Sequence, residues 1–120
     1  MKEGKTKTYD LEKRTLVFAK KARSFARMFP KDFVAYEDLK QLVRASGSVG
    51  ANYIEANNAL SKKDFQMRIK ISKKEAKDCG FWLQLLEAAN EQAEKLRIEL
   101  EKESEELTYI FAAILRNCQQ

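Results

Sequence analysis

Apolar residues return every three or four positions in four separate segments of the chain, which is the period of one face of an α-helix. The first segment runs from Asp10 to about Phe29, and the second runs from Glu37 to Leu60. The third covers about residues 62–89, and the fourth covers about residues 92–117. Each segment carries an apolar stripe beside polar positions, so the pattern predicts four amphipathic helices.

Helix start and stop signals separate these segments. Asp10 is a candidate N-cap for the first helix, and Pro30 ends that helix. Residues 61–64 read Ser-Lys-Lys-Asp, which resembles a capping box with Asp in place of the usual Glu at the start of the third helix. The short connections favour an all-α, antiparallel, up-down-up-down four-helix bundle, with residues 9–120 as a single domain. Residues 1–8 are polar and lysine-rich, and we expect them to form a flexible basic tail.

Two glycines interrupt the second segment. Gly47 and Gly50 lie inside the predicted helix, although glycine costs about 1 kcal/mol relative to alanine in a helix interior. We expect their small size to permit the close approach of another backbone. A tight helix crossing with no further role would explain them equally well.

The same segment has a polar face formed by Arg44, Ser48, Asn52 and Glu55. Arg44 and Glu55 lie about 16 Å apart along a helix axis, which is too far for them to pair within one helix. We therefore expect at least one of them to contact another helix or another subunit. The alternative is a face that contacts only water.

The third segment carries more apolar residues than one inward stripe requires. Beside the inward stripe runs a second apolar stripe, formed by Met67, Ile71, Trp82 and Leu85. A helix at the edge of a monomeric bundle needs only one stripe. We therefore expect the second stripe to form the interface of a homo-oligomer, with a wider internal core as the alternative.

Basic residues gather on the first and third helices. Residues 1–31 carry ten Lys and Arg against three acids, and residues 62–78 carry seven against three. Residues 91–106 carry three against seven, so we expect one basic and one acidic surface. The candidate nucleic-acid-binding residues are Lys13, Lys20, Arg23, Arg27, Lys62, Lys63, Lys70, Lys73, Lys74 and Lys77. A merely solvated face is the alternative for these residues.

The composition argues against several classes of function. The chain has no histidine, so it lacks the usual general base and the commonest metal ligand. Cys79 and Cys118 fall on predicted core stripes, and we interpret them as buried apolar residues rather than as a disulfide. No Gly-rich phosphate loop is present. We expect a protein that is not an enzyme and that needs no cofactor and no metal.

No apolar run approaches the roughly 20 residues that span a bilayer. The N-terminus also lacks the apolar core of a signal peptide. We therefore expect a cytoplasmic protein without a membrane partner.

Several short motifs resemble a known family. The pattern R-x-x-x-S-V-x-x-N-x-x-E-A over residues 44–56 is followed by Ser-Lys-Lys-Asp-Phe at residues 61–65. Further matches are the stretch at residues 10–15 and Lys-Glu-Ala at residues 74–76, with Trp-Leu at residues 82–83. Together they resemble the four-helix-bundle family encoded in intervening sequences of large-subunit ribosomal RNA genes. That family is related to the accessory variability protein of diversity-generating retroelements.

The resemblance implies a ring of five subunits, and it implies nucleic acid or a reverse transcriptase as the partner. Our first hypothesis is a non-enzymatic, oligomeric module that binds RNA or DNA backbone through its basic helix faces. The alternative is a protein-interaction scaffold, such as an accessory partner of a reverse transcriptase. Such a scaffold would use the polar face of the second helix or the acidic fourth helix. The lysines show no aromatic stacking platform among them in the sequence, which weakens the first hypothesis.

Overall fold

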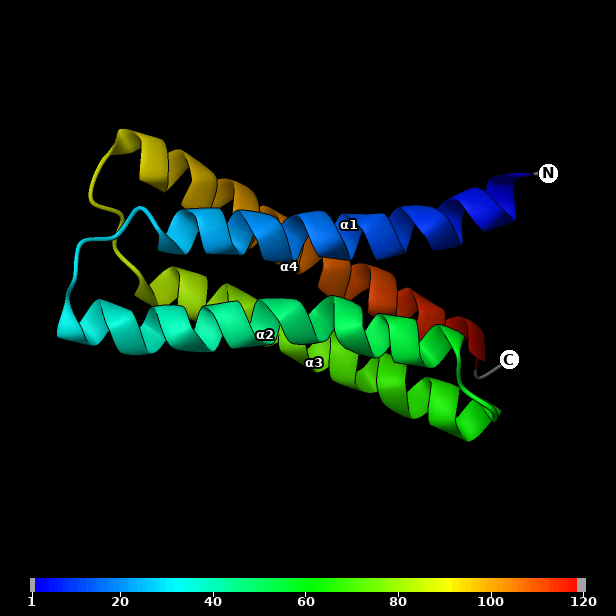
Figure 1. Cartoon of the computed structure of the whole chain (residues 1–120). Helices are drawn as coiled ribbons and strands as arrows, with labels where there is room; N and C mark the ends of the chain where they lie inside the picture. The colour runs from blue at the N-terminus through cyan, green and yellow to red at the C-terminus, as the bar shows by residue number, and fades with distance from the viewer. Residues whose placement is uncertain (1, 119–120) are drawn as a thin grey trace.

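The computed structural model describes the backbone of residues 2–118 and the side chains of residues 10–118. Over residues 2–118 the chain forms four α-helices and no strand (Figure 1). The helices are α1 (Lys2–Ala26), α2 (Phe33–Asn57), α3 (Lys62–Leu85) and α4 (Glu91–Cys118). The predicted all-α fold with four helices is therefore confirmed.

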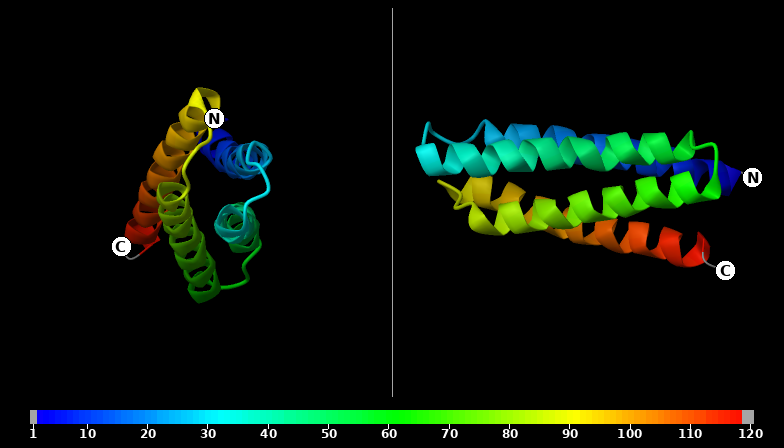
Figure 2. Two further views of the ribbon diagram at one scale, coloured as in Figure 1. Left: turned by 90° about the vertical axis from the view of Figure 1, so that its left-hand side faces the viewer. Right: turned by 90° about the horizontal axis from the view of Figure 1, so that it is seen from below.

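The four helices lie along the long axis of the molecule, and the chain reverses direction at each connection, as Figures 1 and 2 show. α2 packs against α1 and α3, and α4 packs against α3 and α1. The α2/α3 and α3/α4 interfaces are extensive, whereas α1 and α4 contact each other least. Within the described residues α1 and α3 make no direct contact, so they stand at diagonal corners of the bundle.

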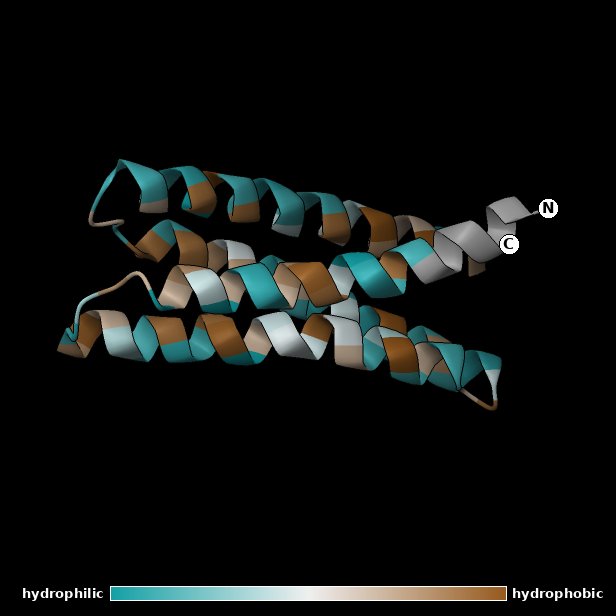
Figure 3. Cartoon of the chain, turned by 45° about the horizontal axis from the view of Figure 1, so that its top comes forward, coloured by the Kyte–Doolittle hydropathy of each residue, from teal (hydrophilic) through white to brown (hydrophobic). Residues whose placement is uncertain are grey.

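The apolar stripes of the helices meet in one core. Figure 3 shows hydrophobic residues recurring in bands along the helices, with hydrophilic residues between them. The largest fully buried apolar side chains are Phe18, Phe25, Leu42, Val49, Ile69, Leu83, Leu100, Leu107 and Phe111, so every helix contributes to the core. None of the helices in the described part of the chain has the length and apolar character needed to cross a membrane.

Cys79 belongs to this core, and Cys118 is half-buried near the end of α4. Both are free thiols, which confirms that they do not form a disulfide with each other. Burial raises the pKa of the Cys79 thiol to about 12, because an apolar environment disfavours the thiolate. Cys79 therefore acts as a small apolar residue of the core.

The glycines of α2 face α1, as their small size led us to expect. A Cβ atom placed on Gly50 would lie 2.8 Å from Oγ1 and 3.1 Å from Cβ of Thr15 in α1. A Cβ atom on Gly47 would lie 3.3 Å from Nη2 of Arg23, which also belongs to α1. Gly50 thus allows α1 and α2 to approach closely, whereas only the flexible end of the Arg23 side chain lies near Gly47.

The predicted starts of two helices are wrong. α1 begins at Lys2 rather than at Asp10, so Asp10 lies inside the helix and does not cap it. α2 begins at Phe33 rather than at Glu37, because the Asp32 carboxylate accepts hydrogen bonds from the backbone N–H groups of residues 34 and 35. Flexibility of residues 1–8 stays a prediction, since Met1 and the side chains before Asp10 lie outside the described residues.

The start of α3 agrees with the prediction, but its end does not. The Ser61 hydroxyl accepts a hydrogen bond of 3.0 Å from the backbone N–H of Asp64, which confirms the N-cap at Ser61. α3 ends at Leu85, four residues before the predicted end. Leu86 adopts an extended backbone and remains buried, so the helix stops while the core continues.

Candidate functional site

The predicted lysines of α3 lie on the solvent side of that helix. Lys62, Lys63, Lys70, Lys74 and Lys77 are exposed, and Lys73 is half-buried. Among these six residues, only Lys74 forms an ion pair with another described residue, at 3.0 Å from Asp78. The hydrogen bond to Asp78 raises the pKa of Lys74 above its ordinary value. Five lysines of α3 are therefore available to an external anion.

The basic residues predicted on α1 behave differently. Lys13, Lys20 and Arg27 are exposed, but Arg23 is half-buried against α2. Arg23 donates a hydrogen bond of 2.9 Å to the carbonyl of Ala19 and one of 3.3 Å to the Ser46 hydroxyl. Arg23 therefore takes part in the α1/α2 interface, and three free basic residues remain.

The structure does not bring the two basic clusters together. α1 and α3 occupy diagonal corners, and the end-on view in Figure 2 shows α2 and α4 on either side of the line between them. The outward faces of diagonal helices point in opposite directions. A single straight nucleic acid cannot contact both clusters of one subunit, so α3 presents the stronger of two separate basic surfaces.

The polar face of α2 lies against α3. The Arg44 guanidinium donates two hydrogen bonds of 3.4 Å to the carboxylate of Glu75, which is 8% exposed. Farther along, Arg68 donates a hydrogen bond of 3.0 Å to the Asn52 side-chain oxygen, and Asn52 in turn donates to Ser48. The expectation that Arg44 or Glu55 contacts another helix is therefore confirmed for Arg44.

Glu55 does not take part in this network. Its side chain is exposed and makes no hydrogen bond or ion pair with any described residue. The residues of α3 that sequence reasoning missed are Arg68 and Glu75, which bond to the polar face of α2, and Ser72, whose hydroxyl donates to the Val49 carbonyl. Their spacing of three to four residues places them on one face of α3, which is the signal that could have identified them.

The second apolar stripe of α3 is only partly covered. Met67 and Leu85 are 54% and 49% exposed, while Ile71 and Trp82 are half-buried. Trp82 packs against the core, and its ring lies 5.2 Å from that of Phe81 in an edge-on arrangement. The core therefore accounts for part of Trp82 but leaves Met67 and Leu85 open to solvent.

A groove of about 830 Å³ lies between α3 and α4. Phe81 of α3 and Tyr109 of α4 line it and are 56% and 68% exposed. Lys73 and Lys77 line the same groove, so two aromatic rings stand beside lysines of the basic surface. The sequence analysis did not identify these two rings as neighbours of the lysines. The position of Phe81 one turn after Lys77 was a signal for this.

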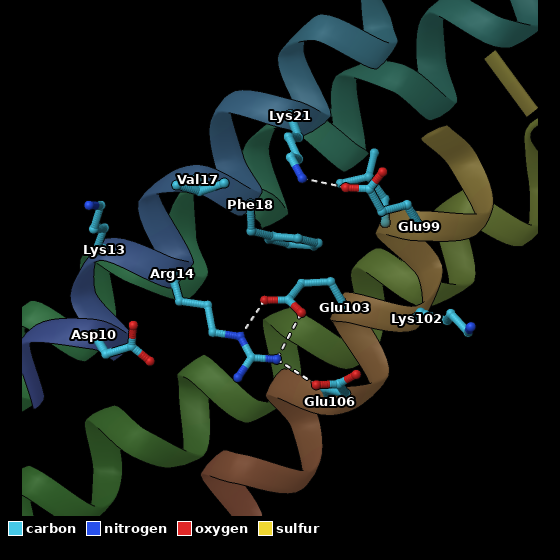
Figure 4. A pocket seen from close by; sticks show the side chains of 11 residues that line it. Asp10, Lys13, Arg14, Val17, Phe18, Lys21, Glu99, Lys102, Glu103 and Glu106 are labelled. Atoms are coloured by element: carbon cyan, nitrogen blue, oxygen red, sulfur yellow. Dashed lines mark hydrogen bonds and ion pairs between the residues drawn. The ribbon is translucent and has the colours of Figure 1, made fainter. Parts of the chain in front are cut away.

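The acidic residues of α4 are largely paired within the molecule. Arg14 of α1 donates to both carboxylate oxygens of Glu103, at 2.6 and 2.9 Å, and to Glu106 at 2.6 Å (Figure 4). Lys21 pairs with Glu99 across the same interface. These pairs reduce the acidic surface that a partner protein could contact on α4.

A further arginine binds two acidic residues within α4. Arg97 bonds to Glu94 and Glu101, and it also donates to the backbone carbonyl of Leu83.

Among the described side chains, no group of three or more cysteine, aspartate or glutamate residues could hold a metal ion.

Comparison with known proteins agrees with this architecture. A family model described as the 23S rRNA-intervening sequence protein matches residues 7–113. The fold is similar to a crystal structure from Bacteroides thetaiotaomicron, described as a protein of unknown function from the S23 ribosomal protein family. The two chains are 27% identical with a TM-score of 0.78, over 92% of this chain and 98% of that one. No match was found among curated proteins. The extent of the family match shows that the chain belongs to the family of 23S rRNA-intervening sequence proteins.

Proposed function

We propose that this protein is a non-enzymatic, homo-oligomeric module that binds the backbone of nucleic acids through the exposed lysines of α3. The observation that carries this proposal is the lysine row, which we define as Lys63, Lys70 and Lys77. These residues follow one another at intervals of seven, so they lie on one side of α3 at steps of about 10.5 Å. All three are exposed, and none has an ion-pair partner within the described part of the chain.

Lysine suits backbone binding better than base recognition. Its ammonium group is a flexible point charge that neutralises phosphate without the bidentate geometry used to recognise bases. Each phosphate that is neutralised releases counterions, so the affinity would fall steeply with salt and depend little on sequence. The family description names an intervening sequence of 23S ribosomal RNA, which fits an RNA-related role but names no ligand.

The oligomer is proposed on the basis of Met67 and Leu85, which are apolar and about half exposed on the second stripe. A ring of subunits, with five as the number that family resemblance implies, would cover this stripe and repeat the lysine row several times. Repetition converts weak individual contacts into strong overall binding through effective concentration. Light scattering should give a mass several times the 13.9 kDa of one chain. A monomer would overturn this part of the proposal.

The test of the lysine row is a charge reversal with a matched control. The Lys63→Glu, Lys70→Glu, Lys77→Glu variant changes the net charge by the same amount as Lys13→Glu, Lys20→Glu, Arg27→Glu on α1. Binding to duplex and single-stranded probes would be measured over a range of salt concentrations. The α3 variant should lose most of its affinity, and its salt slope for duplex DNA should fall by up to about 2.7, or about 0.9 for each phosphate that the variant no longer neutralises.

The α1 variant should retain most of the binding and of the salt slope, because α1 faces the opposite side of the bundle. Equal losses in the two variants would show that net charge alone attracts the probe. Absence of binding by the unmodified protein at low salt would overturn the proposed function. Circular dichroism and light scattering of both variants would establish that fold and assembly are intact.

One observation favours a scaffold that binds a partner protein. Phe33, Val34 and Tyr36 lie together at the start of α2 and are 84%, 67% and 61% exposed. Exposed apolar side chains in such a group are typical of protein-interaction sites. If the protein binds no nucleic acid, this end of α2 is the surface on which to search for a partner such as a reverse transcriptase.

A further inference from the structure

We infer that the groove between α3 and α4 is a binding site for single-stranded nucleic acid, in which bases stack on Phe81 and Tyr109. This inference rests on the proposed function and specifies its ligand. Single-strand binders combine a positively charged groove that follows the backbone with aromatic rings on which bases stack. The groove between α3 and α4 contains both of these elements.

The two aromatic rings stand on opposite helices. Phe81 comes from α3 and Tyr109 comes from α4, and more than half of each side chain is open to solvent. Phenylalanine is among the residue types most often buried in folded proteins, so the exposure of Phe81 is unusual. At the floor of the groove the helices approach closely, since a Cβ atom on Gly80 would lie 3.1 Å from the Ser104 hydroxyl. The rings therefore border an open, shallow channel rather than a gap in the core.

The charge of the groove is more positive than its residue types suggest. Lys73, Lys77 and Lys102 line it without an ion-pair partner among the described residues. Lys102 also borders the hollow between α1 and α4, and Figure 4 shows the end of its side chain turned away from Arg14.

The acids of the groove are mostly neutralised. Asp78 is paired with Lys74, and Glu101 is paired with Arg97. Only Glu105 has no counterion among the described residues that line the groove. Arg97 also pairs with Glu94, so its single charge is shared between two carboxylates. The three free lysines still outnumber the free Glu105 and the half-neutralised Glu101, which favours an anionic ligand.

The groove is also continuous with the lysine row. Phe81 lies one turn beyond Lys77 on the same side of α3, at a rise of about 6 Å. A strand whose phosphates follow the row would therefore bring its next bases to Phe81. Duplex bases are stacked on each other and cannot offer their faces to a protein ring, so the geometry selects a single strand.

The protein contains a natural reporter for this event. Trp82 is the only tryptophan of the chain, and its ring contacts Phe81 edge-on at 5.2 Å. A base that stacks on Phe81 changes the surroundings of Trp82. Binding at α1, on the diagonal corner, would leave the fluorescence of Trp82 unchanged.

The experiment measures the affinity for two probes: a labelled single-stranded oligouridylate and the same strand annealed to oligoadenylate. The oligouridylate has about 15 nucleotides, close to the upper site size of a single-strand-binding domain. Phe81→Ala and Tyr109→Ala should each weaken single-strand binding by about 5- to 150-fold, the range for loss of one stacked base. Phe81→Tyr should retain the affinity, because it keeps an aromatic face. Phe33→Ala removes a ring at the start of α2 that is even more exposed, and it should have no effect.

The outcomes separate the two proposals. Tighter binding to the single strand, with a change in Trp82 fluorescence and the losses above, would support the inference. Equal binding to single strand and duplex, unchanged in Phe81→Ala and Tyr109→Ala, would overturn the inference and leave the proposed function standing. Absence of binding to either probe would overturn both. Thermal unfolding of the alanine variants would show that the bundle remains folded.

Discussion

The contact between α2 and α3 is the most extensive in the bundle, whereas α1 and α4 contact each other least. The α2/α3 interface contains buried polar groups, such as the Ser72 hydroxyl that donates to the Val49 carbonyl and the Glu75 carboxylate, which Arg44 approaches from the solvent side. At the α1/α4 interface, ion pairs of Arg14 and Lys21 border an open hollow of about 480 Å³ (Figure 4). One interface is joined by apolar packing with buried polar groups, and the other by charges near solvent.

This difference determines how each interface responds to change. Removal of a partner from a buried polar group leaves that group without water, which is costly. Removal of a partner from an exposed charge leaves that charge solvated, which costs little. We therefore expect α2 and α3, with the lysine row and the groove, to form the rigid half of the molecule, and the α1/α4 interface to open first.

The largest effect is expected for Arg44→Met. This change leaves the carboxylate of Glu75, whose side chain is only 11% exposed, without its cationic partner. We expect the free energy of unfolding to fall by about 1–3 kcal/mol, the usual cost of an unsatisfied buried group. Chemical denaturation would measure this change. Arg14→Met is the matched control, because its partners Glu103 and Glu106 remain accessible to water.

A second change distinguishes a buried charge from a loss of packing. Glu75→Gln added to Arg44→Met removes the uncompensated charge and should recover a part of the stability. If Arg44→Met proves as mild as Arg14→Met, the Glu75 carboxylate is solvated in solution and the comparison between the two interfaces fails.

An intermediate effect is expected where α1 approaches α2. Gly50→Ala places a Cβ atom 2.8 Å from the buried Thr15 side chain, so the helices must separate. We expect this strain, about 1–3 kcal/mol for an overpacked site, to exceed the gain of about 1 kcal/mol from replacing a helical glycine. Gly47→Ala is the control, because the flexible Arg23 guanidinium can move aside. Thermal unfolding should show a lower midpoint for Gly50→Ala and an equal or higher one for Gly47→Ala.

The sequence predicted the four helices because their apolar residues recur with the helical period. It placed the start of α2 too late because Phe33, Val34 and Tyr36 are apolar yet exposed, so they do not follow the stripe that faces the core. The capping role of Asp32 was missed for the same reason, since the helix was not expected to begin there. Periodicity identifies the faces of one helix, and exposed apolar residues at a helix end obscure its boundary.

The candidate site was less accessible from the sequence, because it depends on which helices are neighbours. The predicted lysines of α3 are exposed except for the half-buried Lys73, but their separation from those of α1 follows from the diagonal placement of the two helices. Phe81 and Tyr109 are 28 positions apart, and only the α3/α4 contact brings them to one groove. The pairing of Arg44 with Glu75 likewise required the α2/α3 contact.

The smallest effect is expected at the α1/α4 interface, where Arg14 bonds to Glu103 and Glu106. The hydrogen bond to Glu103 is the main cause that raises the pKa of Arg14. Because the pKa of Arg14 is higher in the folded than in the unfolded chain, the ion pair contributes its full stability wherever arginine is charged in both states. That contribution is lost only in strongly alkaline solution. Arg14 itself therefore contributes no pH dependence near neutrality, and salt is the useful variable.

A double-mutant cycle of Arg14→Met and Glu103→Gln should give a coupling energy below about 1 kcal/mol. That energy should shrink at about 1 M salt, where the Debye length is about 3 Å. A coupling that is larger, or that persists at high salt, would show that this interface is as well shielded from solvent as the α2/α3 interface.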